Sequence, residues 1–388
     1  LTWVRGPNRW VLKSPPHMEN LAALNAVYPD ATVVITHRDP LAVLQSAITM
    51  IAYGDRIRRK VDLAELANYW TDRIEALLRR CPQPEPRAEL ELRRIRALTY
   101  VGAGKLRAAL RESELAIAGA ARLRDDPLRM FSLLVRRMAN LHLGDFVNAL
   151  RDGTEIERLA HAGQNVQQLT WAQTINAMVR LRLGELGQAR LDLAEASIHA
   201  TESQDQVARC AVDALRAQLL LRRGERARAA ALVGPALLIL RRAKLAVPGI
   251  LVCFRVILEV AYSLQQKQND PALGTGLRQM VRQLGRYSRS NIVAQPAAAL
   301  WQGRLLQEQG DELAAVRSLR QALALAQELQ MPYDQAEVHQ ALAWLGRTAK
   351  TQAAIKALSP RETQEHLAAA RQLYARLQVT KPWGMPAE

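Results

Sequence analysis

The sequence contains little cysteine and few aromatic residues. Its 388 residues include only three cysteines, Cys81, Cys210 and Cys253, which lie far apart. Sparse, dispersed cysteines argue against a disulfide framework or a zinc site and favour a reducing compartment, which we take to be the cytoplasm. Aromatic residues make up 5% of the chain, whereas Ala, Leu, Arg, Gln and Glu, all strong helix formers, are abundant. The composition therefore predicts a mainly α protein.

No long uncharged apolar run is present. The most apolar stretch, Ala246 to Tyr262, is interrupted by Pro248, Arg255 and Glu259, and it falls short of the ~20 apolar residues of a membrane span. No signal peptide is visible. We therefore expect no membrane association. The chain starts at Leu1 within what reads as a fold, so we expect it to be a fragment or remnant of a larger gene.

Positive charge is in excess but is not concentrated. The net charge is +16, which raises the question of nucleic acid or an acidic partner. The densest basic runs are short, Arg56 to Lys60 and Arg93 to Arg96. Arginine is otherwise spread along the helical segments, so we do not expect a nucleic-acid-binding role.

A 40-residue period runs through most of the chain. Gly104, Gly144, Gly184 and Gly224 are each 40 residues apart, and Gly310 lies close to two further periods on. An apolar stripe at helical spacing precedes each glycine and an acidic residue follows most of them. The glycine is expected to end one helix in a left-handed conformation, and the acidic residue to start the next. The pattern predicts seven antiparallel helix pairs, at 84–122, 127–161, 165–200, 205–241, 247–286, 290–329 and 332–378.

These repeats resemble tetratricopeptide repeats. The best match is Trp301 to Asp311 followed by Ala314, Ala315, Leu319 and Ala322. The period exceeds the ~34 residues of the standard repeat, and is more like the arrays at the C-terminus of bacterial signalling ATPases, nucleotide cyclases and transcriptional regulators. The resemblance implies a TPR-like α-solenoid over residues 87–378, followed by a tail at 379–388. It further implies a protein or peptide partner on the concave face, made by the first helix of each pair.

The histidines of this region carry no metal-binding motif. The members are His142, His161, His199, His339 and His366. The sequence shows no close pairing among them, so we expect surface or core residues and no metal site.

The first 80 residues have a different, β-α-β-α pattern. Arg9 to Lys13 and Thr32 to Thr36 are predicted strands, the second β-branched as in a buried parallel strand. Met18 to Tyr28 has helical spacing, and Asp39-Pro40 is typical of a helix start. The segment is predicted to be a small, partial α/β unit, joined to the repeats by a proline-rich linker at 81–86.

Two phrases in this segment fall at predicted strand ends. They are Lys13-Ser14-Pro15-Pro16-His17 and Thr36-His37-Arg38-Asp39-Pro40, with Ser46 eight residues after Arg38. At the carboxyl edge of a parallel sheet such groups face the usual ligand crevice. An arginine at a strand end and a serine in the next helix can bind one phosphate together.

Together these phrases resemble the sulfotransferase family, whose fold is P-loop-like. The resemblance implies that Arg38 and Ser46 hold the 3′-phosphate of the sulfate donor PAPS. It implies that Lys13 lies near the sulfuryl group and that His17 removes a proton from the acceptor hydroxyl. The family's Lys-Ser-Gly-Thr-type phosphosulfate loop has no counterpart here, and its later nucleotide-closing segment is also absent.

Three functions follow from these patterns. The preferred one is a protein-interaction scaffold that carries an incomplete, inactive sulfotransferase-like segment. The first alternative is a PAPS-dependent sulfotransferase whose repeats recruit a hydroxyl acceptor. The second alternative is the regulatory arm of a bacterial signalling ATPase or cyclase.

Overall fold

The computed structural model describes residues 26–27, 29, 86–242, 250–268, 270–289, 291–380 and 382. All helices discussed below belong to the second of two units of the chain, Tyr53–Glu388. The predicted strands at residues 9–13 and 32–36 lie outside the described residues, as does the predicted linker apart from Pro86. The boundaries proposed for the N-terminal segment and linker therefore stay predictions.

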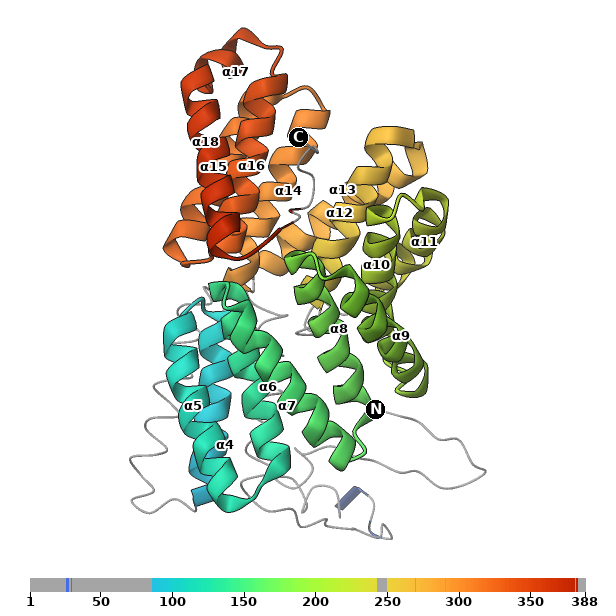
Figure 1. Cartoon of the computed structure of the whole chain (residues 1–388), viewed down its shortest axis with the longest axis vertical. Coiled ribbons are helices and arrows are strands. Elements are labelled where there is room, and N and C mark those ends of the chain that lie inside the picture. Colours follow the sequence, from blue (N-terminus) through green and yellow to red (C-terminus); the bar gives the residue numbers. More distant parts are fainter. Residues whose placement is uncertain are drawn as a thin grey trace. The chain divides into compact units, whose positions relative to one another are not determined.

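The described part of the second unit is an array of antiparallel helix pairs, which confirms the predicted α-solenoid (Figure 1). Its pairs are α4 (Pro86–Gly102) with α5 (Leu106–Leu123), α6 (Asp126–Leu143) with α7 (Phe146–Ala162), α8 (Val166–Leu183) with α9 (Leu186–Glu202), α10 (Gln206–Arg222) with α11 (Arg226–Arg242), α12 (Ile250–Gln268) with α13 (Pro271–Ser288), α14 (Gln295–Glu308) with α15 (Glu312–Glu328), and α16 (Pro332–Thr348) with α18 (Pro360–Arg376). A short 3₁₀ helix, η2 (Ile292–Ala294), precedes α14. We call the first member of each pair an A helix and the second a B helix. Within the described residues these pairs match all seven predicted ones.

The turns inside the pairs follow the predicted chemistry in part. Gly104, Gly144, Gly184, Gly224 and Gly310 all have φ between 73° and 84°, the left-handed conformation that glycine adopts without strain. Asp145 and Asp311 cap the following helices, because their carboxylates accept from the backbone N–H three residues on. Glu185 makes no such bond, so at that position the acidic residue is not a side-chain cap. The long connection after α16 contains a helix of its own, α17 (Gln352–Ala357).

The B helices end differently from the A helices. Four of them are followed by a glutamine with positive φ, at 50° to 58°, and α5 is followed by Arg124 at 54°. The glutamines are Gln164, Gln204, Gln330 and Gln378. A residue with a Cβ in this conformation is strained by roughly 1–2 kcal/mol. The sequence pattern gave no sign of these ends, because it tracked only glycine.

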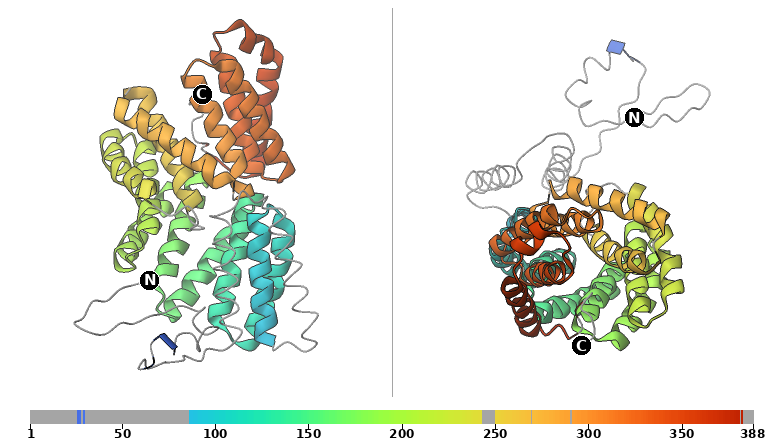
Figure 2. Two further views of the ribbon diagram at one scale, coloured as in Figure 1. Left: turned by 180° about the vertical axis from the view of Figure 1, so that it is seen from behind. Right: turned by 90° about the horizontal axis from the view of Figure 1, so that it is seen from above.

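The C-terminal pairs pack against the turns of the N-terminal pairs. A Cβ on Gly104 would lie 2.5 Å from Leu329, and one on Gly144 would lie 2.5 Å from Leu377. Arg107 Nε donates to Gln330 Oε1 at 2.8 Å. These contacts require the helix pairs to follow a superhelical path that brings the ends of the array together, and the view from above in Figure 2 shows this path. We call this packing the closure of the array.

The core follows from the same closure. One buried apolar cluster extends from Ala97 on α4 to Met331 before α16, and includes residues of α6, α8, α10, α12 and α14. A second, smaller cluster joins Phe146 and Val179 to Tyr333, Tyr374 and Leu377. None of the described helices is long and apolar enough to cross a membrane.

Candidate functional site

The four residues singled out for sulfotransferase chemistry lie outside the described residues. They are Lys13, His17, Arg38 and Ser46. Their convergence on one site stays a prediction, and so does their role toward PAPS. The described residues offer three other features with possible functional chemistry, which are a buried charged cluster, a buried arginine and an exposed apolar patch.

A charged cluster lies where the N-terminal turn of α16 meets the A helices. Arg255 on α12 donates from Nη1 to Asp334 Oδ1 at 2.8 Å and from Nη2 to Glu337 Oε2 at 2.5 Å. Gln218 on α10 donates to Glu259 Oε2 at 2.5 Å. We call these five residues the central polar cluster, and each is at most 6% exposed. Buried ion pairs thus join Arg255 to two residues that lie 79 and 82 positions further along the chain.

Burial and mutual repulsion govern the ionisation of this cluster. Burial, with the negative charge of Glu337 nearby, raises the pKa of Glu259 to about 7. The carboxylates of Asp334, Glu337 and Glu259 outweigh burial at Arg255 and raise the pKa of its guanidinium. Arg255 therefore stays charged, whereas Glu259 can exchange a proton near neutral pH.

Cations and aromatic rings extend the cluster toward α6 and α8. The guanidinium carbon of Arg182 lies 4.1 Å from the ring centre of Tyr333 and 5.7 Å from that of Phe146, both cation–π distances. Burial, with Arg255 and Arg182 nearby, lowers the pKa of His142 to about 3, so this imidazole is neutral at pH 7. His142, Arg182 and Arg222 are spaced by the 40-residue period. The repeat thus places polar side chains at equivalent helix ends, where all three are half-buried.

A second buried charge, Arg137, lies between α6, α7 and α8. It is 1% exposed, and its Nη2 donates to Ala172 O at 3.1 Å and to Asn176 Oδ1. Its Nε and Nη1 have no hydrogen-bond partner. Burial lowers its pKa to about 10. The space for Arg137 exists because α7 carries Gly153, where an added Cβ would lie 2.7 Å from Arg137 Nη2.

This arrangement reverses the pattern of three other repeats. In these repeats the A helix carries a small residue seven positions before the turn glycine, and the B helix carries a larger one nine positions after it. The small residues are Ala177, Ala217 and Gly303, and the larger ones are Leu193, Val233 and Leu319. The second repeat instead has Arg137 and Gly153. Its interior is therefore polar, although nothing in the described residues opens Arg137 to solvent.

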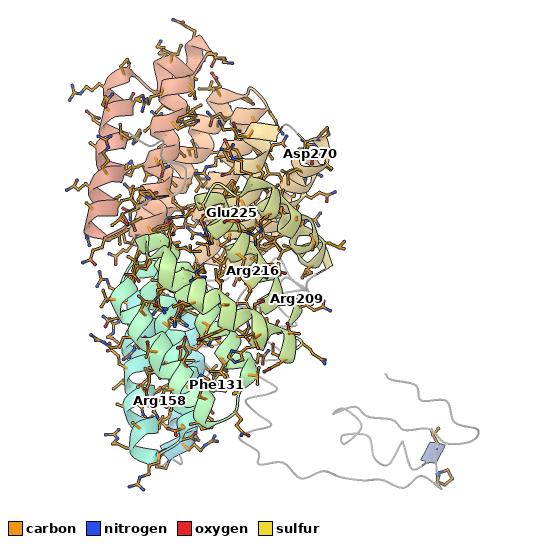
Figure 3. The ribbon with its side chains drawn as sticks, turned by 45° about the vertical axis from the view of Figure 1, so that its right-hand side comes forward. Phe131, Arg158, Arg209, Arg216, Glu225 and Asp270 are labelled. Atoms are coloured by element: carbon orange, nitrogen blue, oxygen red, sulfur yellow. The ribbon has the colours of Figure 1, made fainter. Side chains whose placement is uncertain are left out.

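An apolar patch centred on the exposed Phe131 lies on one face of α6. Leu134 and Met138 follow Phe131 at helical spacing, and both are half-buried because they pack in part against buried apolar clusters. Phe131, labelled in Figure 3, is 39% exposed. The guanidinium carbon of Arg94 on α4 lies 5.7 Å from the ring centre of Phe131. Trp171 holds the equivalent position on α8, and its indole N–H donates to Asp205 Oδ2 at 3.0 Å. We call Arg94, Phe131, Leu134, Met138 and Trp171 the inner patch.

Most of the remaining inner face is covered by the chain itself. Thr174, Met178 and Leu181 continue the face of Trp171 along α8, and each is buried. The corresponding residues of α10, Ala211, Ala214 and Gln218, are buried as well. Sequence reasoning placed the binding surface on the whole inner face. Among the equivalent residues compared on α6, α8 and α10, Phe131 is the exposed one.

Three pairs of side chains were not expected from the sequence. Cys210 and Cys253 interact across α10 and α12, and this contact together with burial raises the pKa of Cys253. Two histidine pairs also form. They are His161 with His199, at 6.4 Å between ring centres, and His339 with His366, at 5.1 Å. The sequence did not predict these contacts, because the paired histidines lie far apart along the chain. Two of these pairs, Cys210 with Cys253 and His161 with His199, are separated by about one repeat. The 40-residue period could therefore have predicted that the members of each pair lie on neighbouring repeats.

Comparisons with known proteins bear on the N-terminal segment. A family model described as the sulfotransferase family matches residues 1–94, which includes the predicted linker and the first half of α4. A solved structure described as a monomeric mutant of IFIT1 with m7Gppp-AAAA is similar over 92% of this chain and 72% of that one, at 15% identity and a TM-score of 0.45. A comparison with curated proteins found no match. The first residues thus resemble sulfotransferases.

Proposed function

We propose that the helical array holds a segment of another protein at the inner patch. The exposed Phe131 beside Arg94 carries this proposal, because a large ring flanked by a guanidinium is a typical anchor of protein interfaces. Leu134 and Met138 extend the apolar surface along α6. Methionine adapts its shape to different apolar partners. The partner segment is therefore expected to present large apolar side chains.

The neighbouring contacts favour a preformed surface. Arg94 Nε donates to Glu91 Oε2 at 2.8 Å, and Trp171 is bonded to the N-cap of α10. These bonds fix two members of the patch before a partner binds, which lowers the conformational entropy lost on association. A rigid, partly apolar surface of this kind suits a scaffold better than a catalyst. We place its action in the cytoplasm of a bacterium, on the low cysteine content and the likeness to bacterial repeat arrays.

To test this, a peptide library is screened for binding to the full chain, and fluorescence anisotropy then measures the affinity of the selected peptides. Phe131→Ala should weaken binding by roughly 2 kcal/mol or more, the loss typical of an anchor residue. Ile198→Ala is the matched control, because Ile198 on α9 is 61% exposed and lies outside the patch. Equal affinity of wild type and Phe131→Ala, or an equal loss in both variants, would exclude the inner patch as the binding surface.

A second candidate function rests on the family match to residues 1–94. We propose that this segment is a remnant of a PAPS site, in which Arg38 and Ser46 bind the 3′-phosphate and Lys13 and His17 flank the transferred group. Calorimetry with adenosine 3′,5′-bisphosphate tests the nucleotide site. Arg38→Ala should weaken binding by about 2–5 kcal/mol if its contact is buried, whereas Arg158→Ala, on exposed α7, should not. No heat with the wild-type chain excludes the site.

A further inference from the structure

A cavity of about 290 Å³ lies at the closure of the array. It is lined by residues 143–147 at the turn between α6 and α7, by Leu183 at the end of α8, by Pro332 at the start of α16, and by residues 376–378 at the end of α18. Thr380 Oγ1 donates to Leu183 O at 2.6 Å and so fixes the chain after α18 beside this cavity. The two ends of the array thus build the cavity together.

The lining of the cavity is largely apolar. Phe146 is 3% exposed, and its ring packs edge-to-face against Tyr333 with 5.9 Å between the ring centres. Leu143 and Leu183 are half-buried, and Val147 is 59% exposed. An apolar group that enters the cavity would remove part of the exposed surface of these side chains from water, which stabilises the complex. The cavity therefore suits a compact apolar group.

Two opposite charges line the same cavity. Arg376 is exposed in the last turn of α18, and among the described residues its guanidinium has no ion-pair or hydrogen-bond partner. The carboxylate of Asp145 accepts from Asn148 N and Nδ2 at 3.0 and 2.7 Å. Each carboxylate oxygen has two lone pairs, so Asp145 can accept further bonds. These two described side chains do not pair with each other, which leaves both available to a ligand that carries one charge of each sign.

We propose that this cavity binds a free α-amino acid with a large apolar side chain. The side chain would lie against Phe146, Leu183 and Leu377. The α-carboxylate would accept two parallel N–H bonds from Arg376, and the α-ammonium would donate to Asp145. The cavity lies just below the ~300–1,000 Å³ of pockets that hold drug-sized ligands, so it selects a smaller molecule. Inside a peptide chain the same residue would carry neither charge.

A bound amino acid would act on the closure. Its contacts would join the turn after α6 to the ends of α8 and α18, which lie together in the closed array. Because a ligand that binds one conformation stabilises that conformation, the amino acid would shift the array toward closure. None of the residues that line the cavity belongs to the inner patch. The site is therefore a regulatory one, distinct from the proposed surface for a partner protein, and different experiments test the two.

Calorimetry on the full chain tests the site with L-phenylalanine and L-leucine as ligands. We expect saturable binding of one molecule per chain. Phenylpropionate and phenethylamine each lack one of the two charges, so they should bind at least about tenfold more weakly than L-phenylalanine. Glycine carries both charges without the apolar side chain and should give no measurable binding.

Two variants test the charged contacts. Arg376→Gln and Asp145→Asn should each weaken the binding of L-phenylalanine by at least about tenfold. Asparagine still caps a helix, so Asp145→Asn removes the charge and keeps the start of α7. The matched controls are Arg347→Gln, in the last turn of α16, and Asp311→Asn, at the equivalent cap of α15. Both lie outside the cavity and should leave the affinity unchanged.

Three results would overturn the proposal. One is the absence of saturable heat with both amino acids. The second is equal affinity for L-phenylalanine and phenylpropionate, because the ammonium group would then have no partner at Asp145. The third is unchanged affinity in Arg376→Gln and Asp145→Asn, which would place the ligand elsewhere. Since the first two results are obtained on the wild-type chain, they do not depend on the folding of any variant.

Discussion

Replacement of Arg255 should open the closure of the array. The guanidinium holds Asp334 and Glu337 on α16, and all three side chains are almost fully buried. Arg255→Met keeps an unbranched apolar side chain and removes the charge. The two carboxylates then remain buried without a cation. Removing one partner of a buried ion pair typically destabilises a protein by about 3–5 kcal/mol.

The expected loss can be separated from a general effect of losing an arginine. Arg361 pairs with Glu365 at 2.9 Å, but both side chains are largely exposed. Arg361→Met should therefore change the free energy of unfolding by about 0–1 kcal/mol. The triple variant Arg255→Met, Asp334→Leu, Glu337→Met removes all three charges together. Apolar replacement of a whole buried ion cluster is often neutral or stabilising by 1–4 kcal/mol, so we expect most of the lost stability to return.

Urea unfolding followed by circular dichroism measures each free energy, and small-angle scattering reports the dimensions of the folded variants. Arg255→Met should show an early transition and a larger radius of gyration, because repeat arrays unfold in parts. If Arg255→Met is destabilised by less than about 1 kcal/mol, like the exposed control, then the buried pairs do not hold α16 against the A helices.

Three further predictions concern other parts of the array. Gly153→Ala should lower the free energy of unfolding by about 2–4 kcal/mol, because the added Cβ displaces Arg137 and weakens charged hydrogen bonds worth about 1.5–3 kcal/mol each. Adding Arg137→Ala should recover part of this loss in urea unfolding. If the effects of the two substitutions on the free energy of unfolding simply add, the reversed packing is contradicted. Exchanging two neighbours, Gly163→Gln with Gln164→Gly, should raise the free energy of unfolding by about 1–2 kcal/mol. The first position has a φ of −90°, which glutamine adopts readily, and the second has a φ of +50°, which favours glycine. An unchanged melting temperature would show that Gln164 is not strained. Between about pH 4.5 and 7 the folded protein binds more protons at Glu259 than the unfolded chain, so its stability should fall as the pH rises through this window. Glu259→Gln should flatten the pH dependence of the urea midpoint. The same dependence of the midpoint on pH in both proteins would contradict the raised pKa of Glu259.

The helix pairs were predictable because their signals are local and repeated. A glycine every 40 residues marks the end of each A helix, and the apolar stripes before it mark the face that packs. The same local reasoning missed α17, because Thr348 to Arg361 carries no repeat signal. It also missed the glutamines with positive φ, because among residue types glycine is the one whose presence in a sequence predicts that conformation.

The candidate site was less accessible to sequence reasoning. Closure joins residues such as Arg107 and Gln330 that lie 223 positions apart, and no local pattern encodes the pitch that brings them together. The exposure of Phe131 depends on this pitch, so Phe131 could not be distinguished from its equivalents Trp171, which is half-buried, and Ala211, which is buried. The reversal at Arg137 and Gly153 is different, because aligning the repeats by their glycines would have revealed it.

Cross-linking between Arg107 and Gln330 tests the closure most directly. The variant Arg107→Cys, Gln330→Cys is made in a Cys81→Ala background, in which Cys210 and Cys253 are buried. A short bismaleimide should link the two new thiols within one molecule of folded protein, and the yield should collapse in urea. Absence of this link in the folded protein, with both thiols reactive, would show that the ends of the array are apart.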